Sequence, residues 1–449
     1  MTAVVAAAET PTNTLVVMPA PATRTTVHAL GWVTAGSMTA NVFSYLVHLP
    51  ASRWLSEAQY GEFAVVLAWL LVVAVPALAA QAVVAREAVR GVDDASLRRL
   101  GIRLTGVVAV AAVVAVPVVG AVAQIGLSTV VPGVLIAPML TLIATGQGIL
   151  QGHSRFRMLG VVLAVVGAAR SVPMIVAVGC GLGVAGALWA GLGGAAVAAA
   201  VVWWLSRSAA VERSAQPPVL WTVVAASQVQ LALVVASSLD LLLSRTVLSA
   251  ADAGVYAVGA VAVKVAFWLP QAVGVVFYPR MADSGQTGRS VRGAATVVAA
   301  LGAVLIVASI LGARLVPILV GHKYDAVVGS LWLFTYTGVA LSLLQILLLA
   351  TIAARRTRWS LMAWAVIGVE ALVILRCAHT VTGLIAVAAL AASVAALAYA
   401  VTFRIWAGPA ETSTRTTEST RYDDAGDQCG DAEQPADQRH DPAPDDLRP

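Results

Sequence analysis

Apolar segments, each long enough to cross a bilayer, follow one another through most of this chain with only short polar loops between them. A hydrocarbon core about 30 Å thick takes roughly 20 helical residues to cross. The segments that meet this length are residues 28–49, 61–83, 104–124, 128–151, 157–179, 182–205, 219–243, 254–278, 293–313, 327–353, 360–378 and 382–404. The pattern predicts an all-α polytopic membrane protein with about 12 transmembrane helices.

Composition and loop length argue against a soluble enzyme. Charged residues make up 11% of the chain and hydrophobic residues 59%, whereas soluble domains are roughly 25% charged. The loops are too short to hold an active site outside the membrane. The cysteines Cys180, Cys377 and Cys429 lack the spacing of a metal site. We therefore expect no enzymatic activity, no catalytic or metal-binding residues and no cofactor.

One stretch of the chain occurs twice. Residues 55–90 contain a polar loop followed by a membrane-length helix, and residues 248–280 repeat this order. The positions that align without a gap are Leu55, Ser56, Ala58, Gly61, Phe63 and Ala64 in the first copy and Leu248, Ser249, Ala251, Gly254, Tyr256 and Ala257 in the second. Paired halves of membrane proteins usually pack around a central substrate path. The repeat predicts two pseudo-symmetric six-helix lobes around a central cavity, formed by residues 28–205 and 219–404.

The remaining segments differ from the helices in composition. Residues 1–27 are rich in Ala, Thr and Pro, and residues 405–449 are polar, acidic and rich in Pro. Neither segment can bury enough apolar surface to fold alone. We predict a disordered N-terminal lead, a cytoplasmic linker at residues 206–218 between the lobes, and a disordered acidic C-terminal tail.

Arginine is distributed unevenly between alternate loops. One set of loops holds Arg86, Arg90, Arg98, Arg99, Arg103, Arg155, Arg157, Arg207, Arg213, Arg280, Arg289, Arg292, Arg355, Arg356, Arg358 and Arg404, whereas the other set holds Arg53, Arg245, Arg314, Lys323 and Arg376. Loops rich in Lys and Arg face the cytoplasm. We predict a multi-pass protein of the plasma membrane, the bacterial inner membrane, with both termini cytoplasmic. The spread of charge over short loops argues against nucleic-acid binding.

Several motifs resemble those of a known family. Residues 55–63 (LSEAQYGEF), 148–156 (GILQGHSRF) and 321–326 (GHKYDA) are similar in order and spacing to segments of oligosaccharide flippases. These flippases form the polysaccharide-transporter branch of the multidrug/oligosaccharidyl-lipid/polysaccharide (MOP) exporter superfamily, whose members share a MATE-like fold. The motif glycines Gly61, Gly254 and Gly321 are expected to shape turns from loop to helix.

The resemblance implies a function as well as a fold. It implies a transporter that flips a polyprenyl-diphosphate-linked oligosaccharide from the inner to the outer leaflet by alternating access, for cell-surface polysaccharide biosynthesis. The implied partners are membrane lipids and the glycosyltransferases or polymerase of the same pathway.

Charged residues inside a membrane span are costly, which makes each of them a functional candidate. Helical spacing puts Lys264 on one face with Trp268 and Gln271, a combination suited to a diphosphate and a sugar ring. Arg170 shares a face with Gly167, whose small size would let a head group approach. The other candidates for the cavity are Asn41, Arg53 and Arg245.

Two carboxylates in the spans are candidates for coupling transport to Na⁺ or H⁺. Asp240 and Glu370 can serve this purpose because burial brings the titration of a carboxyl group closer to physiological pH. The same charges also permit a structural interpretation, in which Lys264 pairs with Asp240 or Glu370 and Arg170 pairs within its own lobe to stabilise packing.

Three other functions compete with the flippase. A MATE-type drug or cation antiporter would use carboxylates in its first helix, and residues 30–49 contain none. A membrane glycosyltransferase using lipid-phosphate sugars would carry acidic catalytic residues in a large first external loop, and residues 50–60 contain Glu57 alone. An assembly scaffold would lack a cavity.

Overall fold

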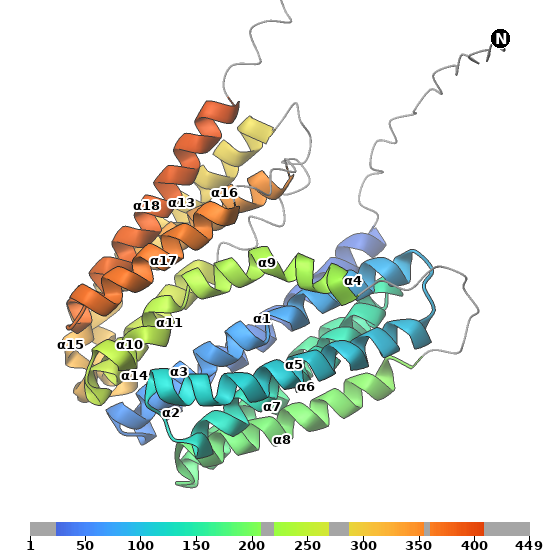
Figure 1. Cartoon of the computed structure of the whole chain (residues 1–449), viewed down its shortest axis with the longest axis horizontal. Coiled ribbons are helices and arrows are strands. Elements are labelled where there is room, and N and C mark those ends of the chain that lie inside the picture. The colour runs from blue at the N-terminus through green and yellow to red at the C-terminus, as the bar shows by residue number, and fades with distance from the viewer. Residues whose placement is uncertain (1–23, 208–219, 269–286, 354–359, 408–449) are drawn as a thin grey trace, which may run out of the picture. The chain divides into compact units, whose positions relative to one another are not determined.

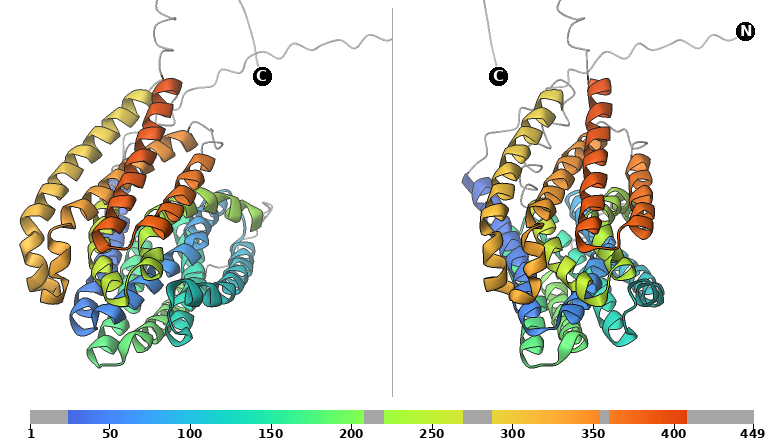
Figure 2. Two further views of the ribbon diagram at one scale, coloured as in Figure 1. Left: turned by 60° about the vertical axis from the view of Figure 1, so that its left-hand side comes forward. Right: turned by 90° about the vertical axis from the view of Figure 1, so that its left-hand side faces the viewer.

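The computed structural model describes residues 24–207, 220–268, 287–353 and 360–407, and within these ranges it contains helices and no strand. Figures 1 and 2 show the helices. Residues up to Tyr399 belong to one compact unit, and residues from Ala400 onward belong to a second. Where they are described, the predicted apolar segments fall mainly on helices, and residues 269–278 of the segment 254–278 lie outside the described residues. The prediction of an all-α polytopic membrane protein is confirmed.

The helices of the first half follow the predicted spans. They are α1 (Arg24–Leu46), α2 (His48–Trp54), α3 (Glu57–Val73), α4 (Val75–Val89), α5 (Asp94–Ala123), α6 (Leu127–Gly152), α7 (Phe156–Gly179) and α8 (Gly183–Leu205). Together α3 and α4 make one span, with Pro76 at the start of α4, where the missing N–H is tolerated.

The helices of the second half are more broken. They are α9 (Leu220–Ala236), α10 (Leu239–Val247), α11 (Ala250–Trp268), α13 (Thr287–Gly312), α14 (Val316–Val320), α15 (Asp325–Val328), α16 (Leu331–Ala353), α17 (Ser360–Cys377) and α18 (Val381–Ala407). The predicted continuous helix over 219–243 is wrong, because α9 and α10 meet at a bend of 42°, which is visible in Figure 1. The bend lies at Ser237 and Ser238, and serine pairs are known kink sites.

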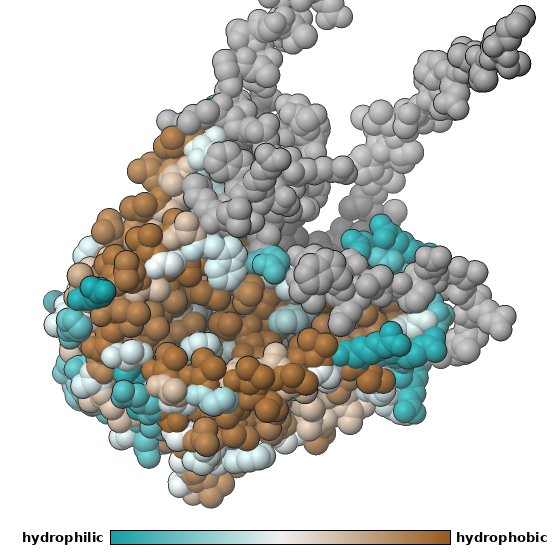
Figure 3. Space-filling view, viewed as in Figure 1, coloured by the Kyte–Doolittle hydropathy of each residue, from teal (hydrophilic) through white to brown (hydrophobic). Residues whose placement is uncertain are grey.

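The surface has the apolar character that lipid contact requires. Nine helical segments of the described chain are long and apolar enough to cross a membrane, or ten if α9 and α10 count as one span. Large apolar side chains are exposed on α5 and α13, among them Val110 and Leu311, at 66% and 75%. Figure 3 shows apolar residues over much of the visible described surface.

The flanking segments of the prediction fall mostly outside the described residues. This applies to residues 1–23 of the predicted lead, to residues 208–218 of the predicted linker and to residues 408–449 of the predicted tail. Helix α1 begins at Arg24, inside the range predicted for the lead. The last helix continues past the predicted boundary to Ala407.

The repeated loop motif starts a helix in both copies. The Ser56 hydroxyl accepts a hydrogen bond from the Gln59 N–H, and the Gln59 side chain accepts one from the Ser56 N–H, which is a capping box at the start of α3. Ser249 stands in the same place before α11, and its hydroxyl accepts a hydrogen bond from the Asp252 N–H. Both serines therefore satisfy N–H groups that a helix start leaves without an intrahelical partner.

The glycines of the repeat have a different role from the predicted one. Gly61 and Gly254 lie inside α3 and α11 rather than in turns. A Cβ on Gly254 would lie 1.9 Å from the Glu57 carbonyl oxygen, and one on Gly61 would lie 2.9 Å from the Gly254 nitrogen. The two repeat copies thus meet backbone to backbone, at a distance that only glycine allows. Gly321 does lie in a turn, with φ of 107°, as predicted.

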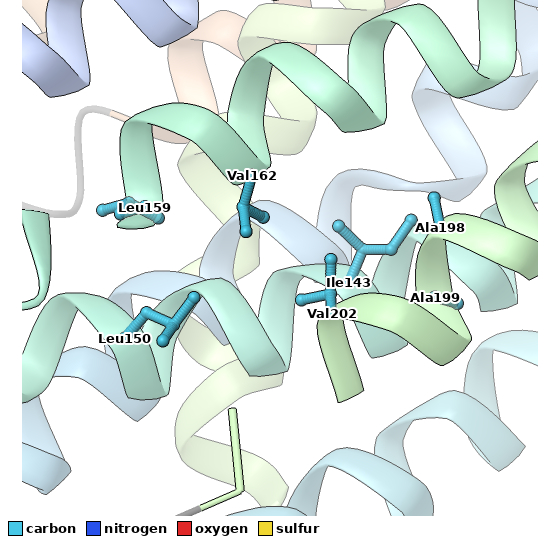
Figure 4. Packing of buried hydrophobic residues seen from close by; sticks show 7 residues of the cluster. All are labelled: Ile143, Leu150, Leu159, Val162, Ala198, Ala199 and Val202. Carbon is cyan, nitrogen blue, oxygen red and sulfur yellow. The ribbon is translucent and has the colours of Figure 1, made fainter. Parts of the chain in front are cut away.

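Small residues also set the packing of α1 on α7. A Cβ on Gly36 would lie 2.1 Å from the Gly160 carbonyl oxygen, and one on Gly167 would lie 2.6 Å from the Ala40 Cα atom. Close approach of this kind is typical of helices that associate in lipid. Helix α7 also contributes Leu159 and Val162 to an apolar cluster shared with α6 and α8, shown in Figure 4.

Candidate functional site

Lys264 lies at the break between α9 and α10. Its ammonium group donates hydrogen bonds to the Ser238 hydroxyl at 2.7 Å and to the Ser237 carbonyl oxygen at 3.3 Å. That carbonyl follows the end of α9, where helix carbonyls lack intrahelical partners and carry partial negative charge. The lysine therefore stabilises the broken helix in this structure. It makes no ion pair with Asp240 or Glu370 in the described part of the chain.

Asp240 sits in the first turn of α10, next to the same break. One carboxylate oxygen accepts a hydrogen bond from the Leu241 N–H at 2.8 Å, and the other accepts one from the Tyr256 hydroxyl. Tyr256 comes from the repeat motif at the start of α11, so the second repeat copy positions this carboxylate. A negative group at a helix start is also favoured by the helix dipole.

Glu370, on α17, faces the same region without a bonded partner. It is only 7% exposed, and its carboxylate makes no hydrogen bond or ion pair within the described residues. Together with Asp240 and Thr337 it supplies the polar groups of a small cavity whose other lining residues are apolar and come from α9, α16, α17 and α18. The cavity volume of about 20 Å³ suits one water molecule or a bare cation. It is far too small for a sugar.

Arg170, on α7, contacts α1. Its guanidinium donates a hydrogen bond to the Ser44 hydroxyl at 3.0 Å, and in the described chain it has no carboxylate partner. The predicted free space beside Gly167 is absent, because the Ala40 backbone of α1 fills it. The small size of Gly167 therefore does not open space for a head group. It lets α1 pack closely, which brings Ser44, one helical turn after Ala40, against Arg170.

The two remaining cationic candidates bind backbone carbonyls. Arg53 donates to the Ile318 carbonyl at 3.0 Å. Arg245 donates to the carbonyl oxygens of Ala123 at 2.9 Å and Ala58 at 3.3 Å, and it pairs with Glu62 at 3.6 Å. Ala123 ends α5, so this arginine satisfies a terminal helix carbonyl and offsets its partial charge.

Three polar candidates are placed only in part. Asn41 is exposed on α1. Trp268 is the last residue of α11, and Gln271 lies outside the described residues. The predicted stripe of Lys264, Trp268 and Gln271 therefore stays a prediction.

Two polar groups that the sequence did not single out lie near these residues. His48, at the start of α2, has its Nδ1 atom 3.1 Å from the Tyr60 hydroxyl. Trp69, on α3, has a buried indole N–H that makes no hydrogen bond. A signal for His48 was available, since Asn41, Ser44 and His48 follow helical spacing and form one polar stripe along α1 into α2.

Comparison with known proteins identifies the fold. No protein-family model and no curated protein matches the sequence. An inward-facing multidrug resistance MATE family transporter of the MOP superfamily matches with a TM-score of 0.65 at 13% identity, over 84% of this chain and 98% of the other. The lipid II flippase MurJ, in an inward closed conformation, matches with a TM-score of 0.60 at 11% identity, over 84% and 87%.

A third solved structure with this fold is described by the polarity of its binding pocket. A MOP superfamily transporter from Pyrococcus furiosus, described as having a binding pocket of reverse polarity, matches with a TM-score of 0.53 at 16% identity, over 84% of this chain and 95% of the other. At such identities the likeness establishes the fold. The predicted MATE-like fold is therefore confirmed.

Proposed function

We propose that this protein is a membrane transporter that flips a lipid-linked oligosaccharide across the plasma membrane by alternating access. Proteins of the same fold include transporters and a lipid flippase. The fold supports transport in general, and the choice of an anionic lipid-linked substrate rests on the charges inside the spans.

Arg170 is the observation that carries the proposal. It lies nine residues before the end of α7 at Gly179, which is about 14 Å at roughly 1.5 Å per residue. That depth is close to the middle of a hydrocarbon core about 30 Å thick. A charged residue there costs about 2.5 to 3.5 kcal/mol on insertion scales. Among the described residues, Arg170 has one hydrogen bond, to the neutral Ser44 hydroxyl, and no counter-ion.

An anionic substrate supplies the missing charge. A diphosphate offers several oxygens to the planar guanidinium, which has five N–H donors and binds phosphate in a bidentate manner. Lys264 adds a second cation from the other half of the chain, and the described residues accept hydrogen bonds from two of its three N–H donors. A polyprenyl-diphosphate-linked oligosaccharide combines this head group with a lipid tail that keeps it in the membrane.

Asp240 and Glu370 are proposed to couple transport to a cation. Their shared cavity holds a water molecule or a bare ion but no larger group. An unpaired carboxylate in apolar surroundings is costly unless a proton or Na⁺ neutralises it. Binding of either ion to Glu370 would remove that cost, and Tyr256 already stabilises Asp240.

The same carboxylate cavity favours a second candidate, a drug or cation antiporter. In that case a cationic substrate would exchange against the coupling ion, and Arg170 would repel it. The two functions therefore predict opposite effects of the Arg170 charge.

A flipping assay with the purified full-length protein tests the proposal. The protein is reconstituted in liposomes with a fluorescent polyprenyl-diphosphate-linked sugar, and flipping is followed by a membrane-impermeant quencher. We expect wild-type protein to flip this lipid and Arg170→Gln to slow it at least about tenfold, the value of roughly one charged hydrogen bond. Arg157→Gln is the matched control, because Arg157 lies on the same helix but is exposed and stacks on Trp32.

The control and a second substrate separate the functions. Arg157→Gln should flip the lipid like the wild type. Transport of a lipophilic cation, together with no flipping of the diphosphate lipid, would support the antiporter. Equal flipping by wild type and Arg170→Gln would contradict an anion site at Arg170.

A further inference from the structure

His48 is held in a defined orientation at the junction of α1 and α2. Its Nδ1 atom lies 3.1 Å from the Tyr60 hydroxyl. Its ring contacts Tyr60 and Phe63 edge to face, with centroid distances of 6.0 and 6.1 Å. Such edge contacts fix ring direction as well as adding apolar contact. The start of α3 therefore holds the imidazole from one side.

The other side of His48 is close to Arg170. Ser44, which accepts the Arg170 hydrogen bond, lies one helical turn before His48 on the same face of the α1 and α2 segment. Helix α2 also packs against α7, which carries Arg170. His48 thus lies beside the unpaired cation that the proposed function assigns to the substrate.

One nitrogen of His48 is free to bind a ligand. The described residues provide no hydrogen-bond partner for Nε2. Among the described residues, Trp69 Nε1 is the fully buried side-chain N or O atom that lacks a hydrogen-bond partner. Nε2 of His48 also lacks a partner among them but is not fully buried, so this atom keeps some accessible surface. When the Tyr60 hydroxyl donates to Nδ1, the single proton of a neutral imidazole sits on Nε2. His48 then carries an N–H donor at Nε2 that no described residue accepts.

We propose that His48 is a specificity-determining residue, whose Nε2–H donates to a phosphate oxygen of a lipid-linked diphosphate held at Arg170, with Tyr60 as the positioning residue. This inference rests on the proposed function and identifies the residue that binds one phosphate of the head group. Ser44, which holds the Arg170 guanidinium, and His48 stand one helical turn apart, roughly 5.4 Å along the segment. The two donors therefore come from different helices, α7 and α2, and two linked phosphates can bind one donor each, whereas the oxygens of one phosphate share a single phosphorus atom. The site therefore selects a diphosphate over a monophosphate.

Calorimetric titration of the full-length protein in detergent tests this selection. The probes are farnesyl diphosphate and farnesyl monophosphate. We expect His48→Phe, which keeps a ring but removes both nitrogens, to weaken diphosphate binding roughly tenfold or more, as loss of a hydrogen bond to a charged group does. Monophosphate binding should change little, so the preference between the probes should collapse. His48→Gln keeps an amide donor and should stay within about threefold of wild type.

Two further variants separate the outcomes. Arg170→Gln should weaken the binding of both probes. If it binds both like the wild type, the proposed function fails together with this inference. If Arg170→Gln weakens binding while His48→Phe keeps the wild-type preference, the proposed function stands and the role of His48 is refuted. Tyr60→Phe removes the hydrogen bond to the imidazole and should lower the preference for diphosphate over monophosphate by about threefold. This variant also tests the inference if His48→Phe does not fold. An unchanged preference in Tyr60→Phe would refute the positioning role.

A competition experiment identifies the source of the phosphate. Excess phosphatidylglycerol in the micelles should leave farnesyl diphosphate binding unchanged, because a phospholipid head group carries one phosphate. Equal competition by phosphatidylglycerol would mean that the site binds ordinary lipid, and it would overturn the assignment.

Discussion

Replacing Gly167 with alanine tests how the packing of α1 on α7 positions Arg170. A Cβ at this position would lie 2.6 Å from the Ala40 Cα atom, 3.0 Å from its Cβ atom and 3.2 Å from its carbonyl oxygen. Carbon atoms in favourable contact are about 3.5 to 4.0 Å apart. Because Ala40 presents backbone rather than a flexible side-chain end, the helices would have to separate by roughly 1 Å.

The separation affects both stability and the site. A gap of about 1 Å forfeits up to roughly half of the dispersion energy of the affected contacts, and overpacking of this kind costs about 1 to 3 kcal/mol. Alanine recovers up to about 1 kcal/mol through its helix propensity. We expect a net loss of about 1 to 2 kcal/mol. The Arg170 to Ser44 distance, now 3.0 Å, would approach about 4 Å, beyond hydrogen-bonding range.

Thermal unfolding and ligand titration of the purified protein measure these effects. Gly167→Ala should unfold at a lower temperature and bind farnesyl diphosphate more weakly. Gly193→Ala in α8 is the matched control, because no atom lies within 4 Å of the added Cβ, and it should be neutral or stabilising. A Gly167→Ala protein as stable as the wild type, with unchanged affinity, would refute the argument that this contact positions Arg170.

Three further predictions follow from single contacts. Hydrogen bonds from Ser96 lower the pKa of Asp93, the N-cap of α5. The ionised cap should therefore stabilise the protein by about 1 kcal/mol at neutral pH, and this stabilisation should be lost as the pH falls below about 4. Unfolding curves of Asp93→Ala should lack this pH dependence. Tyr256→Phe removes one hydrogen bond to the buried Asp240 and should destabilise the protein by about 1 to 3 kcal/mol, measured by chemical unfolding against the wild type. Cys377 is exposed at the end of α17 and, as the sole cysteine, should react with an impermeant maleimide added outside intact cells. Reaction only after permeabilisation would show that the predicted topology is reversed.

The sequence predicted the spans because their signals are local. Twenty apolar residues in a row must be helical in a bilayer, where each backbone polar group needs an internal partner. The start of α3 was likewise readable, since Ser56 and Gln59 are three residues apart and form their capping box without help from other helices. Candidate charges such as Arg170 could be named for the same reason, because a charge within an apolar span is visible in the sequence and is costly in lipid.

Contacts between distant residues were decided only by the packing of the helices. The sequence predicted turns at Gly61 and Gly254, and the structure instead shows a crossing of α3 with α11. It also missed the break at Ser237, whose carbonyl follows the end of α9 and accepts a hydrogen bond from Lys264 on another helix.

The pairing of His48 with Tyr60 belongs to the same class. The two residues are 12 positions apart and lie on different helices, so their contact exists only once α2 and α3 are placed side by side. A hydropathy pattern records whether a residue is in the membrane. Which side chains meet there depends on how closely two backbones can approach, and therefore on the glycines at every crossing.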